Sequence, residues 1–135
     1  MTKFLTYPVI TTVAFFCASN CMAEAITKDK YQFLEKNIES EYESAKKRCE
    51  KLQANAGDIC LAELKGQKSV SKAELKLKYE PTLENEVDAR IAKAEAEYSV
   101  AKEKCDDVKE KSSCNELAVS AKDKAIADAR AMKKL

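Results

Sequence analysis

The chain contains no histidine, no tryptophan, and only two glycines and two prolines in 135 residues. Histidine is the most common general base, the usual partner of a catalytic serine or cysteine, and the most common metal ligand. Two glycines nine residues apart also cannot form a glycine-rich phosphate-binding loop. We therefore expect a protein that is not an enzyme, with no catalytic residue, no cofactor and no metal site.

The chain also has almost no net charge. The chain has 24 basic and 23 acidic residues, although charged residues make up 35% of it. A nucleic-acid-binding protein needs an excess of positive charge to displace counterions from phosphates, so we expect no nucleic-acid partner. Few glycines and prolines together with abundant Ala, Lys, Glu and Leu are typical of long helices or coiled coils, which predicts an all-α fold.

Residues 1–25 differ from the rest of the chain. Lys3 is followed by an uncharged, largely apolar stretch that ends at Glu24. A short positive start, an apolar core and small residues at the end are typical of a secretory signal peptide, and cleavage can follow Ala23 or Ala25. The sequence thus predicts an exported protein, periplasmic in a Gram-negative source and otherwise secreted.

Two alternatives for this segment remain open. One is a retained transmembrane anchor, although the stretch is near the lower length limit for a span and contains Pro8. The other is a lipoprotein with Cys21 as the acylated residue, although Asn20 occupies the position where a small residue is required.

Four cysteines follow the predicted signal peptide, and an even number in an exported protein indicates two disulfides. They lie within a repeated phrase: EYESAKKRCEKLQANAGDIC, residues 41–60, recurs as EYSVAKEKCDDVKEKSSC, residues 97–114. Tyr, Ala, Cys and an aliphatic residue recur 56 positions apart, which makes each copy a self-contained unit. The repeat therefore predicts the disulfides Cys49–Cys60 and Cys105–Cys114. A thiolate metal site is disfavoured because such sites typically use C-x-x-C pairs.

Each unit is predicted to form two helices joined by a short turn, because apolar residues recur in steps of three and four. Before the first turn the stripe is Tyr31, Leu34, Ile38, Tyr42, Ala45, Cys49 and Leu52. Before the second turn it is Val87, Ile91, Ala94, Tyr98, Ala101, Cys105 and Val108. In the helix after the first turn the pattern is less regular, and the residues expected to be buried are Leu61, Leu64, Val70, Ala73, Leu75 and Leu77. After the second turn we expect Cys114, Leu117, Ala121, Ala125, Ala129 and Met132, since a strict heptad would bury Asp128.

The predicted fold is therefore two tandem disulfide-stapled helical hairpins, elongated or arranged like a four-helix bundle, after an N-terminal signal peptide. The segments are 1–25 for the signal peptide, 26–80 for the first hairpin and 81–135 for the second. In the first turn, Gly57 is expected to end one helix and Asp58 to cap the next. In the second, the box from Ser113 to Glu116 predicts that a helix starts there.

Two positions could interrupt the helices. Proline predicts a break at residues 79–81, with a new helix beginning at Pro81. Gly66 has three interpretations: a tolerated glycine costing about 1 kcal/mol, the end of a short helix that restarts at Ser71, or a close helix crossing. The last is suggested by Ser120, another small residue, at the matching place in the second repeat.

The phrases AKKRCEKLQANAGDIC and AKEKCDDVKEKSSC resemble those of a loose group of exported bacterial proteins rich in Ala, Lys and Glu. Such proteins carry Y-x-x-A-K-x-x-C followed by a second cysteine after a short turn, usually in tandem. The resemblance covers most of residues 38–135. It implies an envelope address and the stapled hairpin, and it implies no ligand.

The leading functional hypothesis is a non-enzymatic structural or protein-interaction module of the cell envelope. Its role would be in envelope maintenance or in the response to stress. Helices with apolar seams pack on each other or on a partner, so a protein partner or self-association is expected. A first alternative is an amphipathic protein that binds membrane surfaces or unfolded chains, because lysines flank the apolar stripes. A second is a thiol–disulfide exchange protein, which requires a low-pKa cysteine, whereas only lysines and Arg48 lie near the cysteines.

Overall fold

The computed structural model describes residues 25–134, and within them the chain is entirely helical. The helices are α1 (Lys28–Cys49), α2 (Asn55–Tyr79), α3 (Leu83–Cys105) and α4 (Lys111–Ala131), followed by the short 3-10 helix η1 (Met132–Lys134). The all-α prediction and the two stapled hairpins are confirmed. The apolar stretch before Glu24 and the acylation candidate Cys21 lie outside the described residues.

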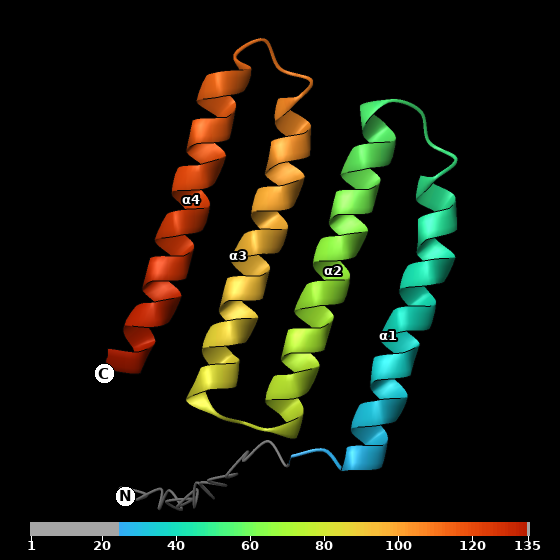
Figure 1. Ribbon diagram of the computed structural model, residues 1–135, viewed down its shortest axis with the longest axis vertical. Helices are drawn as coiled ribbons and strands as arrows, with labels where there is room; N and C mark the ends of the chain where they lie inside the picture. The colour runs from blue at the N-terminus through green and yellow to red at the C-terminus, as the bar shows by residue number, and fades with distance from the viewer. Residues whose placement is uncertain (1–24, 135) are drawn as a thin grey trace, which may run out of the picture.

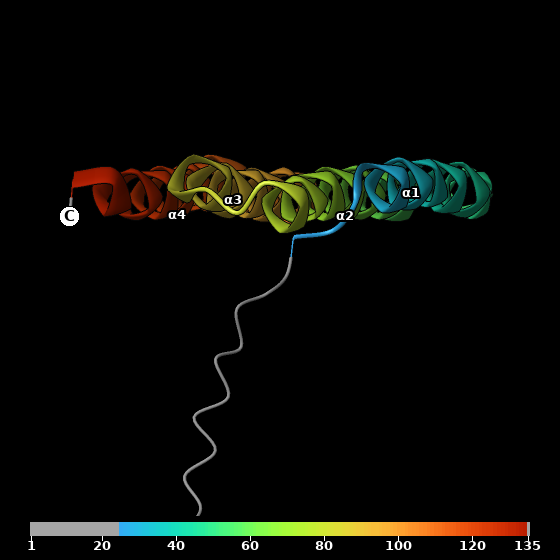
Figure 2. The ribbon, with the colours of Figure 1, turned by 90° about the horizontal axis from the view of Figure 1, so that it is seen from below.

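The four long helices lie side by side in one layer, in the order of the chain (Figure 1). Of the long helices in residues 25–134, α1 packs on α2, α2 on α3, and α3 on α4, and no other pair packs together. Seen from below, they form a single row (Figure 2). Of the two arrangements expected for the hairpins, the structure therefore has the elongated one, an open layer with two broad faces and two outer edges.

The fully buried interior of this layer consists mostly of small side chains. The buried hydrophobic residues are Ala45, Cys49, Ala62, Leu75, Val87, Ala92, Ala94, Cys105 and Ala129. In this part of the chain only Leu75 and Val87 contribute large aliphatic side chains to that set. Hydrophobic burial contributes about 25 cal/mol per Å² of apolar area, so small residues leave a modest margin of stability that the disulfides increase.

Threonine caps the helices that open each repeat. The Thr27 hydroxyl accepts from the Lys30 backbone N–H at 3.3 Å, and the Thr82 hydroxyl accepts from Asn85 N–H at 3.2 Å. The break predicted at residues 79–81 is confirmed. The start predicted at Pro81 is two residues early, because Thr82 supplies the N-cap and α3 begins after it.

The first hairpin turn corrects the role predicted for Gly57. It does not end α1, which finishes at Cys49, but lies buried in the first turn of α2. A Cβ there would lie 3.2 Å from the backbone oxygen of Leu52, so a larger residue would push the turn away from the helix start by a few tenths of an ångström. Asp58 does not cap α2 either. It lies in the first turn, where a carboxylate interacts favourably with the helix dipole.

The second hairpin turn corrects the start predicted for the last helix. α4 begins at Lys111, two residues before the Ser113 box, and its N-cap Glu110 makes no side-chain capping bond. The backbone N–H of Cys114 instead donates to the carbonyl of Glu110 at 3.0 Å. The helix therefore starts directly after the turn, and the predicted capping box lies inside the helix and not at its start.

Most of the predicted stripes are confirmed. The stripes of α1 and α3 are buried or half-buried up to Cys49 and Cys105, the last residues of those helices. Leu52 and Val108, which ended the predicted stripes, fall in the turns and are 49% and 42% exposed.

The stripe predicted for α4 is wrong at two positions. Leu117 is 71% exposed and Ala121 is also exposed, whereas Ala118 and Lys122 face the interior. α4 packs on α3 and on the short η1, and among the described residues α3 is its only long neighbour. Only a narrow stripe of α4 is therefore covered by its neighbours, and Cys114 and Lys122 lie on this stripe.

Gly66 lies inside a continuous α2, which excludes the restart predicted at Ser71. A Cβ at Gly66 would be 2.7 Å from the Ala96 Cβ and 3.2 Å from its Cα, closer than side chains approach. The close helix crossing is therefore the correct interpretation. Here α2 and α3, which no disulfide links, pack with almost no space between their backbones.

Candidate functional site

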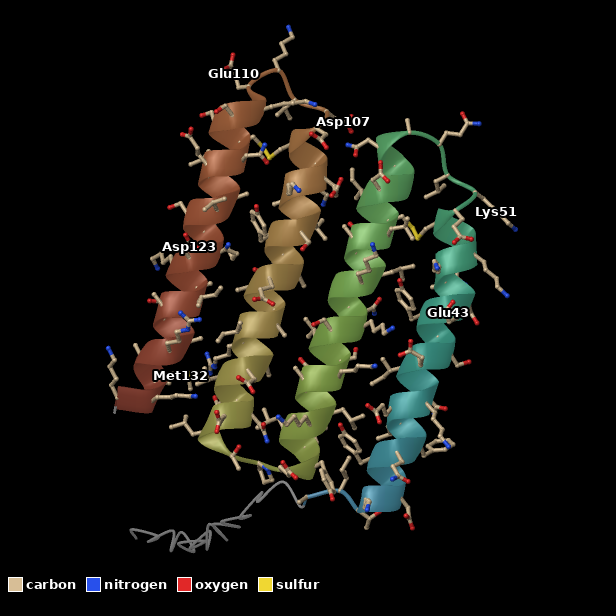
Figure 3. All side chains as sticks on the ribbon, in the orientation of Figure 1. Glu43, Lys51, Asp107, Glu110, Asp123 and Met132 are labelled. Carbon is tan, nitrogen blue, oxygen red and sulfur yellow. A yellow bond between two sulfur atoms is a disulfide. The ribbon has the colours of Figure 1, made fainter. Side chains whose placement is uncertain are left out.

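The four predicted cysteines form the two predicted disulfides at the tips of the hairpins (Figure 3). The Cα atoms are 5.5 Å apart in Cys49–Cys60 and 5.6 Å apart in Cys105–Cys114, which is the usual separation for a disulfide. Cys49 and Cys105 are each 1% exposed. Cys60 and Cys114 are half-buried, so each bond closes its helix pair beside the turn with one of its two cysteines fully buried.

Each hairpin also carries a lysine above a tyrosine ring, a pair that sequence analysis did not find. Lys68 Nζ lies 4.2 Å from the centre of the Tyr42 ring, and Lys122 Nζ lies 4.7 Å from that of Tyr98. The tyrosines are 56 residues apart and the lysines 54, so the sequence contained a signal in the recurrence of both. In such a pair the lysine ammonium is attracted to the face of the tyrosine ring, and the lysine methylenes cover part of the ring.

Glu39 of α1 joins two lysines of α2 on the first hairpin. Lys68 Nζ donates to Glu39 Oε1, and Lys72 Nζ lies 3.1 Å from Glu39 Oε2. Hydrogen bonds from Lys68 and then from Lys72 lower the pKa of Glu39 below its ordinary 4.5. The same bond to Glu39 raises the pKa of Lys68 above its ordinary 10.5.

We expect the Glu39 carboxyl to titrate below pH 4.5 in an NMR pH titration of the folded protein, because two ammonium groups favour its ionised form. Its folded-state pKa is lowered, so its contribution to stability is complete above the unfolded pKa and is lost as the pH falls through the folded pKa. Lys68→Gln should raise the Glu39 pKa more than Lys72→Gln does. An unchanged Glu39 pKa in Lys68→Gln would contradict the assignment.

Two grooves flank α2 on the same broad face, since Gln67 and Ser71 line both. The groove between α2 and α3 has a volume of about 630 Å³ and an apolar floor made by Gly66, Ala96 and Val100. The groove between α1 and α2 has about 400 Å³ and runs beside Tyr42 and Arg48. Both are shallow features of a helical surface, suited to side chains of a protein partner.

The rim of the α2–α3 groove carries charges of both signs, and they are Glu63 and Glu74 on α2 and Lys93, Glu97 and Lys104 on α3. Lys104 Nζ lies 3.8 Å from Glu63 Oε1 across the groove. A rim with both signs of charge suits a partner that is itself mixed in charge, and gives no preference for a polyanion.

Large exposed apolar residues are distributed over different elements. They are Phe33, Leu52, Leu83, Val108, Leu117 and Val119. Along residues 25–134, no helix is both long enough and apolar enough to cross a membrane, and no group of three or more Cys, Asp or Glu residues is placed to hold a metal ion.

Comparison with protein-family models finds no match to this chain, and comparisons with curated proteins and with solved structures find none either.

Proposed function

We propose that this protein is a non-enzymatic structural or protein-interaction module of the cell envelope. The observation that carries the proposal is the open single layer, which leaves all four helices exposed on two broad faces. A closed bundle would use those faces for its own core, whereas here one of them carries two grooves, and the groove between α2 and α3 has an apolar floor and a charged rim. Helical faces of this kind bind other helices or extended segments of proteins.

The two disulfides indicate an oxidising compartment outside the cytoplasm, since reducing systems keep cytoplasmic thiols reduced. Among such compartments we propose the periplasm if the source is a Gram-negative cell, and the outside of the cell for any other source. The uncharged stretch before Glu24 supports this as a signal peptide.

Intact mass spectrometry of the protein from its source cells tests the address. We expect a mass that begins at Glu24 or Ile26, with four cysteines alkylated only after reduction. The control is the same sample alkylated without reduction, which should gain no label. A full-length chain with free thiols would contradict export, and a lipid increment at Cys21 would show an acylated form.

Photo-crosslinking in cells tests the interaction. A benzophenone amino acid at Gln67 lies on the grooved face of α2. Placed at Ser69 instead, it lies roughly 200° around the helix and is the matched control. We expect Gln67, and not Ser69, to trap one discrete envelope protein. Equal labelling from both positions, or none from either, would contradict a specific interaction through this face.

Binding to membrane surfaces is the competing function, and the wide separation of Phe33, Leu83 and Leu117 gives it little support. Co-sedimentation with anionic vesicles at moderate salt distinguishes the two. The proposed module stays in the supernatant. Sedimentation with vesicles, reversed by Phe33→Ser or Leu117→Ser, would replace the proposal.

A further inference from the structure

The packing of α2 on α3 joins the second helix of one repeat to the first helix of the next. Gly66 meets Ala96 at its centre. At its upper end the Asn55 amide donates to the backbone oxygen of Glu103 at 2.8 Å and to the Asp107 carboxylate at 2.7 Å. This junction contains no disulfide, so helix packing, polar contacts and the short loop of residues 80–82 hold the two hairpins in line.

The two outer edges of the layer are formed by α4 and α1, which are the repeat equivalents of the two junction helices α2 and α3. α4 is the second helix of its repeat and, like α2, has an edge that a following helix could cover. α1 is the first helix of its repeat and, like α3, has an edge that a preceding helix could cover. Within residues 25–134 neither edge is covered, because α1 packs on α2, and α4 packs on α3 and η1.

Small residues recur where the junction needs them. Counted from the cysteines, Ser120 of α4 corresponds to Gly66, and Ser40 of α1 corresponds to Ala96. Both serines are exposed. If α4 of one molecule packed on α1 of another in the junction register, these two serines would meet at the point of closest approach, and Ala127 would meet the 57% exposed Phe33.

The edges differ from the junction by carrying charges spaced by seven residues. They are Glu116, Asp123 and Arg130 on α4, and Asp29, Lys36 and Glu43 on α1. All six are exposed, and Figure 3 shows Asp123 and Glu43 at opposite edges of the layer. In the junction register Asp123 faces Lys36 and Arg130 faces Asp29, which are pairs of opposite sign.

Glu116 and Glu43 form the one mismatched pair in this register, with Lys47 one helical turn further along α1. None of the ion pairs among residues 25–134 includes Lys36 or Lys47. Both lysines are exposed and free to pair with a partner, whereas Asp123 also lies 3.4 Å from Lys122 and would be shared between Lys122 and Lys36 of the next molecule.

We propose that the partner at these edges is a second copy of this chain, with the outer edge of α4 packed on the outer edge of α1 of the next molecule. The inference rests on the proposed function, for which it names one partner. The two surfaces are different, so the contact is heterologous and repeats from molecule to molecule. The assembly would extend the helical layer sideways in an open row.

Sedimentation velocity of the mature, disulfide-bonded protein at low salt tests this arrangement. The weight-average mass should rise with concentration past that of a dimer, and should fall on adding salt, which screens exposed charges. Asp123→Lys and Lys36→Glu should each weaken association about tenfold, because an exposed attraction becomes a repulsion. An equimolar mixture of the two variants should associate again, since each then offers a matching edge.

Glu43→Lys is the sharpest variant, because it should strengthen association by removing the mismatch with Glu116. Lys65→Glu makes the same charge change as Lys36→Glu but on an exposed broad face of α2, and as the matched control for that variant it should leave association unchanged. A mass that stays monomeric at all concentrations would overturn the inference. So would association that is unaffected by Asp123→Lys and Lys36→Glu, which would place the contact on a broad face.

The two proposals fail separately. A monomer that still crosslinks from Gln67 to an envelope protein would overturn the second-copy inference and leave the proposed function standing. An edge-dependent assembly without any such crosslink would leave the inference standing and remove the interaction with another envelope protein.

Discussion

Removing both disulfides, by Cys49→Ala with Cys60→Ala and Cys105→Ala with Cys114→Ala, is expected to unfold much of the protein at 37 °C. Each bond closes a short loop, with sequence separations of 11 and 9 residues, and contributes on the order of 3 kcal/mol to the free energy of unfolding. Few large side chains lie in the interior to compensate. Thermal unfolding followed by circular dichroism should show a loss of more than about 10 °C for each pair removed.

The two pairwise variants serve as controls for one another. Losing Cys105–Cys114 should destabilise mainly the second hairpin, where α4 has only α3 as a long neighbour, so α4 amides should lose hydrogen-exchange protection first. Losing Cys49–Cys60 should act in the same way on α1. Unfolding that is insensitive to reduction would contradict a stabilising role for the disulfides.

Gly66→Leu is expected to lower the free energy of unfolding by about 3 kcal/mol, because the added side chain forces α2 away from α3. Even a Cβ would lie 2.7 Å from the Ala96 Cβ. The loss should outweigh the gain of about 1 kcal/mol that replacing a helical glycine usually brings. Urea unfolding followed by helical circular dichroism measures the difference.

Ser120→Leu is the matched control, because it makes a similar change at the corresponding position of the second repeat, on an exposed edge. In dilute monomer it should change stability by no more than about 0.5 kcal/mol. Ala96→Gly in the Gly66→Leu background should recover part of the loss by making room opposite residue 66. A Gly66→Leu protein as stable as the wild type would show that the helices separate freely at this crossing.

Cysteine pairing and helix content could be predicted from the sequence because both depend on local repetition. The 56-residue recurrence links Cys49 to Cys105, and steps of three and four identify the inward faces of α1 and α3. Helix starts were harder to predict. Gly57 and the Ser113 box have the composition of caps, yet α2 begins at Asn55 and α4 at Lys111, and neither helix start has a side-chain capping bond.

The open layer could not be predicted, because the same apolar stripes are compatible with a closed bundle. The stripes predict packing within each hairpin, whereas the contact of α2 on α3, where Gly66 meets Ala96, joins the two repeats and is not specified by them. The edge position of α4 then explains why Leu117 is exposed although its spacing matches a core stripe. The tyrosine–lysine pairs were missed because each joins residues of two helices, and a single-helix periodicity does not relate them.

The hairpin tips have a consequence for the response of the protein to proteases. Lys51 and Glu110 lie on these projecting turns, whose backbones are exposed and readily cut (Figure 3). Each turn lies between the two cysteines of one disulfide, so a chain cleaved after Lys51 stays joined through Cys49–Cys60. The molecule can therefore be nicked at either tip and keep all four helices covalently connected.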